Sequence, residues 1–143
     1  MKRTQYGDYA TWVTFEVMAN YQVRIIFSEN LMKSAKARGV YSTSDNSDNA
    51  DAFVSHLKNT GMSYMFLPLD ITEHGVAHEA WHVVYRMMHY INVNDLDDEI
   101  IAYHLDHLVE KIYRFKNKIQ KPEVLNDPRT GIEKSSKSRN RRR

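Results

Sequence analysis

Cysteine is absent from this chain of 143 residues. Its absence excludes disulfide scaffolds, cysteine-based zinc sites and cysteine nucleophiles, so any metal ion must be bound by histidine, aspartate or glutamate. The chain also lacks an apolar run of the about 20 residues that a transmembrane helix needs. The first residues, MKRTQYGDYATW, are basic and lack the apolar stretch of a secretory signal. We therefore expect a cytoplasmic protein with no membrane partner.

Acidic residues are missing from the end of the sequence, although the chain as a whole is nearly neutral. Residues 134–143, KSSKSRNRRR, carry six cations and no anion, while the remainder has 14 basic and 18 acidic residues. The length suits one domain with a two-layer core. We predict a single domain over residues 1–125 and a disordered basic tail over residues 126–143.

The first half of the chain carries signals for two strands and a short helix. Residues 12–18 and 21–27 are rich in β-branched and aromatic side chains and predict strands. A helix is expected over residues 29–38, where Ser28 is placed to cap its start and Gly39 to end it.

A β-hairpin is predicted next. Residues 52–58 and 62–68 flank Asn59-Thr60-Gly61, a tight-turn sequence, and the second strand stops at Pro68. A short helix over residues 50–58 is the alternative for the first of these segments.

Two longer helices are expected in the second half. Asp70 and Glu73 form a capping pair for a helix at about 71–90, and a turn at 92–97 leads into a helix at about 97–118. The apolar stripe of the last helix consists of Ile101, Leu105, Leu108, Ile112 and Phe115. The predicted fold is α+β, with a small mixed sheet packed against two antiparallel helices.

The segment 73–90, EHGVAHEAWHVVYRMMHY, contains four histidines and the pattern H-E-x-x-H at His78, Glu79 and His82. In a helix these two histidines lie one turn apart on one face, where a single metal ion can bind both. Glu79 lies beside the first histidine and can reach a bound water. The sequence therefore predicts a metal site that performs hydrolysis.

The phase of this helix separates the motif from the core. Its apolar stripe consists of Val76, Ala80, Val83, Val84 and Met87. The opposite stripe consists of His74, His78, His82, Tyr85 and His89. The competing interpretation is a solvent-facing polar stripe that contains histidine by chance, and the mid-helix position of the motif favours metal binding.

Two histidines do not complete a catalytic zinc site, which has three protein ligands and a water. Glu99 is the favoured third ligand, because the turn folds its helix back beside the first one. The competing residues are His104, His107, Asp98 and His89. His104 points nearer the apolar side, and His89 would have to bind from the same helix as the histidine pair.

The order of strand, H-E-x-x-H helix, turn and a second helix with the pattern E-x-x-A-Y (residues 99–103) resembles the small zincin metallopeptidases of the gluzincin type. It is similar in particular to compact HExxH proteins of phages and bacteria, including the ImmA/IrrE-like group. The resemblance covers residues 62–110 and implies a minimal zincin-like fold that binds Zn²⁺. Its implied zinc ligands and catalytic base are His78, His82, Glu99 and Glu79.

The sequence departs from this family in two respects. Trp81 is bulky where many members have a small residue, and no helix-turn-helix segment accompanies the domain. The substrate class is therefore not implied by the resemblance.

The implied mechanism is hydrolysis of a peptide bond with Glu79 as general base. The developing oxyanion needs a further donor, for which Tyr103, His104 and His107 are the candidates. By the same resemblance, an extended peptide is expected to add to the edge of the strand at 62–67.

The expected function is a zinc metallopeptidase that acts on an intracellular protein or peptide. The alternative is a nucleic-acid-associated or protein-binding module that uses a zincin scaffold. In that case the basic residues 134–143 are expected to contact nucleic acid.

Overall fold

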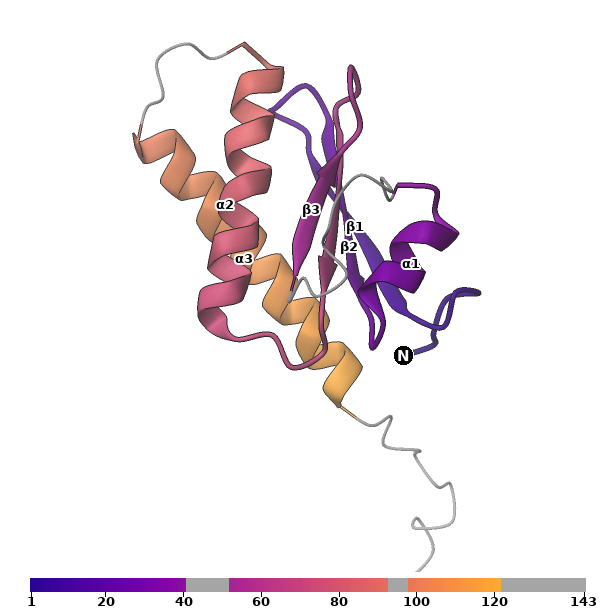
Figure 1. Cartoon of the computed structure of the whole chain (residues 1–143). Coiled ribbons are helices and arrows are strands. Elements are labelled where there is room, and N and C mark those ends of the chain that lie inside the picture. Colours follow the sequence, from indigo (N-terminus) through magenta and orange to yellow (C-terminus); the bar gives the residue numbers. More distant parts are fainter. Residues whose placement is uncertain (41–51, 93–97, 122–143) are drawn as a thin grey trace, which may run out of the picture.

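A computed structural model describes residues 1–40, 52–92 and 98–121 of the chain. Within these ranges it contains one four-stranded sheet and three helices, which confirms the predicted α+β class (Figure 1). The tail over residues 126–143 lies outside the described residues, so its disorder and its contact with nucleic acid stay predictions.

The elements follow each other as β1 (Tyr9–Phe15), β2 (Tyr21–Phe27), α1 (Leu31–Ala37), β3 (Phe53–His56), β4 (Met62–Leu67), α2 (Glu73–Tyr90) and α3 (Asp98–Gln120). The sheet order is β1-β2-β4-β3. β2 and β4 are parallel, and the two outer pairs are antiparallel. A parallel pair needs a crossover connection, which here contains α1 and β3. The sheet is therefore mixed, as predicted.

The position of β4 corrects one expectation. β4 pairs with β2 on one side and with β3 on the other, so the strand at 62–67 has no free edge for a substrate. The edges of the described sheet are β1 and β3. The hairpin of β3 and β4 is confirmed, and the alternative helix over residues 50–58 is wrong.

Several predicted boundaries move because tertiary pairing overrides local propensity. β2 has the predicted bounds, but β1 lies three residues earlier than expected because Phe15 pairs with Tyr21 and closes the hairpin. The turn that follows places Ala19 and Asn20 at positive φ values of 51° and 57°.

The helix caps also differ from the prediction. Asn30, not Ser28, caps α1 by accepting a hydrogen bond from the Lys33 amide at 2.9 Å. Thr72, not Asp70, caps α2 and accepts from the Gly75 amide at 3.2 Å. Both are short polar side chains of the type that satisfies free amides at a helix start.

The helices form a layer on each face of the sheet. α2 and α3 cover one face and enclose the larger core, whereas α1 covers part of the other (Figure 1). The two long helices are antiparallel, as predicted, since Lys116 near the end of α3 donates to the Ile71 carbonyl just before α2 at 2.7 Å. None of the helices in the described ranges has the length and apolarity to cross a membrane.

A buried ion pair joins the start of β1 to the end of α1. Arg38 donates two hydrogen bonds to Asp8, at 2.6 and 2.7 Å, and Ser34 donates a third at 2.7 Å. The side chains of Asp8 and Arg38 are almost fully buried. Burial works to raise the pKa of Asp8, but the hydrogen bonds from Arg38, Thr4 and Ser34 outweigh it and hold this pKa below its usual value.

We expect Asp8→Ala to lower the free energy of unfolding by about 3–5 kcal/mol, because it leaves the buried Arg38 without its anion. Glu29→Ala is the matched control, since its pair with Arg3 is solvent-exposed and its loss should change stability little. Urea denaturation of the two variants measures the difference. Equal stabilities would contradict the structural role of the Asp8–Arg38 pair.

Candidate metal centre

The rotation of α2 about its axis is set by its apolar stripe. Val76, Ala80, Val83, Val84 and Met87 are all buried, as predicted, and Met88 joins them. His78 and His82 lie outside this stripe and are exposed. The predicted separation between the core face and the histidine face is therefore confirmed.

The two histidines of the motif point toward one another. Their Nε2 atoms lie 3.1 Å apart, and their rings are nearly perpendicular. Two nitrogens bound at about 2.0–2.1 Å to one tetrahedral zinc ion lie roughly 3.3 Å apart. The spacing of this pair therefore fits two adjacent ligands of one ion.

Glu79 differs from its histidine neighbours in being buried, with 7% of its surface exposed. Burial raises the pKa of the Glu79 carboxyl above its usual value, while positive charge on His78 and His82 works against this shift. A carboxylate that is partly desolvated holds a proton more readily than an exposed one. This property suits a group that takes a proton from water.

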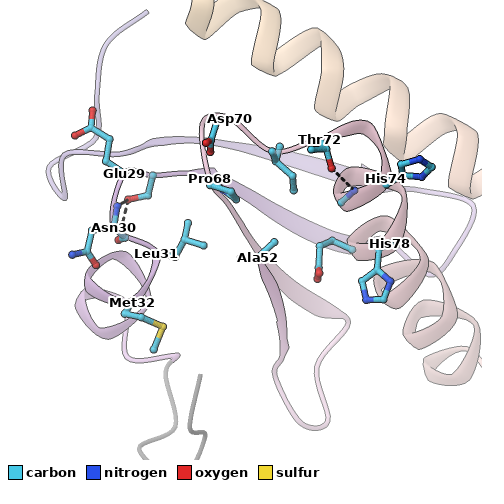
Figure 2. Close-up of a pocket in the computed structure, with 14 residues that line it drawn as sticks. Glu29, Asn30, Leu31, Met32, Ala52, Pro68, Asp70, Thr72, His74 and His78 are labelled. Atoms are coloured by element: carbon cyan, nitrogen blue, oxygen red, sulfur yellow. Dashed lines mark hydrogen bonds between the residues drawn. The ribbon is translucent and has the colours of Figure 1, made fainter. Parts of the chain in front are cut away.

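Glu79 and His78 line a pocket with a volume of about 870 Å³. Figure 2 shows Leu31 and Met32 of α1 on one side of it and His78 on the other. The floor between them includes Ala52 next to β3. The pocket thus extends from the H-E-x-x-H helix to an apolar region at the start of α1.

Glu99, the predicted third ligand, is an exposed residue in the first turn of α3. Since α2 and α3 are antiparallel, this turn lies toward the end of α2 (Figure 1). His78 lies in the first half of α2, and His82 lies at its middle. Among residues 1–40, 52–92 and 98–121, no three histidine, aspartate or glutamate side chains are grouped to hold a metal ion. The ligand role of Glu99 therefore stays a prediction.

The predicted oxyanion donors lie on α3, and two of them contact β1. The rings of His104 and His107 both contact Phe15 of β1, each with centroids 5.7 Å apart. His104 is buried, as its apolar position indicated, and Tyr103 is 69% exposed. β1 is the sheet edge opposite β3, three strand spacings of about 4.8 Å away. The catalytic role of Tyr103, His104 and His107 therefore stays a prediction.

Sequence reasoning missed His56, the last residue of β3. Its Nδ1 lies 2.7 Å from Ser63 Oγ, and Ser63 Oγ lies 2.5 Å from the hydroxyl of Tyr21. Burial lowers the pKa of His56 to about 4, with smaller contributions from the positive charges of Arg86 and His82 on α2. The register of the β3–β4 hairpin, which pairs His56 with Ser63, was the signal that could have identified it.

This pKa predicts a pH-dependent stability. His56 is neutral in the folded protein between pH 6.5 and about 4, where the unfolded chain binds a proton at this residue. The stability that His56 contributes is therefore present above pH 6.5 and is lost as the pH falls to about 4. We expect His56→Gln to lose less unfolding free energy over this range than the wild type, as measured by urea denaturation. His89→Gln, at an exposed position of α2, should behave as the wild type; identical losses in all three proteins would contradict the prediction.

No known protein-family model, curated protein or solved structure matches this chain.

Proposed function

We propose that this protein is a zinc-dependent metallopeptidase with a minimal zincin-like fold, which hydrolyses a peptide bond in an intracellular protein. The observation that carries the proposal is the 3.1 Å approach of His78 Nε2 and His82 Nε2. A pocket next to the buried carboxylate of Glu79 supports it, because hydrolysis needs room for a substrate as well as a base.

The donor set fits zinc better than the harder cations. Two imidazole nitrogens that can bind the same ion favour zinc or another transition metal, whereas magnesium and calcium prefer oxygen ligands. His78 and His82 would hold the ion, with Glu99 as the proposed third ligand. When bound there, zinc supplies Lewis acidity that lowers the pKa of water.

The residues of the chain supply the remaining chemistry. Glu79 takes a proton from the attacking water and later delivers it to the leaving amine. Its carboxyl group is held in place because the helix buries it at the border of the core. The pocket beside it accommodates a substrate side chain among the apolar residues Leu31, Met32 and Ala52.

An extended substrate peptide would lie along β3. This strand is an edge of the described sheet and lies next to α2, the helix that carries the motif. Edge strands bind extended peptides through main-chain hydrogen bonds. β3 thus takes the role that the sequence had suggested for the strand at 62–67.

We expect the purified wild-type protein to contain close to one zinc ion per chain, as measured by elemental mass spectrometry. His82→Ala should lose the metal, because it removes one of the two converging nitrogens. Glu79→Gln should keep the metal and lose peptidase activity toward a pool of fluorogenic peptides, because the amide cannot accept the proton.

The control for these variants is His89→Ala, an exposed histidine of the same helix that lies two turns beyond His82. It should keep both zinc and activity. A wild-type protein that contains no metal, and whose thermal stability is unchanged by a chelator, would refute the metal site. If the protein contains zinc and its biological effect survives Glu79→Gln, the protein would instead be a binding module on a zincin scaffold.

Glu99 is the proposed third ligand, and its replacement tests this role. Glu99→Ala should weaken zinc binding more than about 100-fold, since loss of an outer partner of a ligand alone costs 10–100-fold. Asp98→Ala is the matched control, because it removes an adjacent carboxylate from the same turn. Competition with a zinc-sensitive dye measures both affinities. Wild-type affinity in both variants would exclude Glu99 and Asp98, and parallel variants at His89, His104 and His107 would then identify the ligand.

A further inference from the structure

A row of polar side chains crosses the sheet on the face that α2 and α3 cover. It consists of Tyr21 on β2, Ser63 on β4 and His56 on β3, joined by one hydrogen bond between Tyr21 Oη and Ser63 Oγ and another between Ser63 Oγ and His56 Nδ1. Tyr21 is 2% exposed and Ser63 is fully buried. Polar groups in such a core are costly unless each hydrogen-bonding atom has a partner.

The number of available hydrogens sets the direction of these bonds. Tyr21 Oη and Ser63 Oγ each carry one hydrogen, and Ser63 Oγ is the partner that the structure shows for the buried Tyr21 hydroxyl. If Tyr21 donates to Ser63, then Ser63 donates to His56 Nδ1, and both hydroxyl hydrogens are satisfied. The reverse direction would leave the Tyr21 hydrogen buried without an acceptor. In this direction of the bonds His56 accepts at Nδ1, which places its remaining proton on Nε2.

β3, which carries His56, packs against α2. Arg86 and His82, which lie one turn apart on that helix, are close enough for their charges to act on His56, and the charge of Arg86 also acts on Tyr21. His56 itself lies at the end of the edge strand along which a substrate peptide would bind. The His56 imidazole is thus on the strand that packs against the helix of the motif, within range of the charge of His82.

We propose that His56 is the oxyanion donor of this site: its Nε2–H, held in position by Ser63 and Tyr21, donates a hydrogen bond to the carbonyl oxygen of the peptide bond that is cleaved. This inference rests on the proposed peptidase function and assigns to β3 a role that the sequence had suggested for α3. Arg86 adds positive charge on the same side of α2.

The addition of water to the peptide carbonyl needs no further reactant. The oxygen of water forms a bond to the carbonyl carbon, the electron pair of the C=O π bond moves onto the carbonyl oxygen, and Glu79 takes the proton of the water. His56 keeps its own proton throughout and only donates a hydrogen bond. A donor that is already oriented stabilises the negative oxygen without the reorganisation that water would need.

The first test is independent of catalysis. Long-range ¹H–¹⁵N spectra of the full-length protein at neutral pH report which ring nitrogen of each histidine carries the proton. We expect the Nε2–H form for His56 in the wild type and a mixture of both forms in Ser63→Ala, which lacks the donor to Nδ1. A His56 ring that is protonated at Nδ1 and not at Nε2 in the wild type would overturn the proposal.

The second test measures how much the His56 donor contributes to the binding of a probe. The probe is a phosphonamidate dipeptide, whose tetrahedral phosphoryl oxygens imitate the attacked carbonyl, titrated calorimetrically into the zinc-loaded protein. His56→Phe keeps a ring of similar size but removes the N–H, and we expect it to raise the Kd about 100-fold with unchanged zinc content. Ser63→Ala should raise the Kd about 10-fold, since it releases the ring without removing it.

A control variant and the zinc content of the wild type separate a failure of this proposal from a failure of the metallopeptidase proposal. His89→Phe makes the same exchange at an exposed position of α2 and should bind the probe as the wild type does. If the wild type binds zinc and the probe, but His56→Phe has the wild-type Kd, this proposal is wrong and the metallopeptidase proposal stands. If the wild type binds no zinc, both fail. Thermal melts of each variant show whether a loss of probe binding results from unfolding. If His56→Phe is unfolded, the Kd of Ser63→Ala for the probe tests the proposal.

Discussion

The burial of one helical stripe determines the geometry of the whole candidate site. Val76, Ala80, Val83, Val84 and Met87 pack α2 onto the sheet, and burial of a large aliphatic side chain contributes about 1.5–3 kcal/mol. Rotation of the helix by one residue would expose part of this stripe and bury histidine instead. At about 100° per residue, the locked stripe leaves Glu79 at the border of the core and His78 and His82 beyond it.

This constraint gives the three residues of the motif different environments. The histidines remain exposed and converge to 3.1 Å between their Nε2 atoms, whereas the intervening carboxylate is buried beside the pocket. Metal ligands need access to an ion, and a general base benefits from partial desolvation. One amphipathic helix supplies both conditions, because the base Glu79 follows the ligand His78 by one residue and therefore lies about 100° further around the helix.

The mixed sheet adds a second level of organisation. The parallel pairing of β2 with β4, and the hairpin of β4 with β3, place Tyr21, Ser63 and His56 in one hydrogen-bonded row. Each of these residues comes from a different strand, and two of them are buried under α2 and α3. The row connects the middle of the sheet to the edge strand β3, which packs against α2. Its hydrogen bonds offset the cost of polar atoms in the core and orient the imidazole.

The sequence by itself determined the elements that depend on local chemistry: the strand at 21–27, the hairpin around Asn59-Thr60-Gly61, both long helices and the phase of the H-E-x-x-H motif. These features follow from residue periodicity and turn propensity, which act within a few neighbours. The tertiary structure decided where β1 ends, that β4 is central, that Glu79 is buried and that β3 packs against α2. Each of these depends on pairing between segments far apart in the chain, where register and packing override local preference.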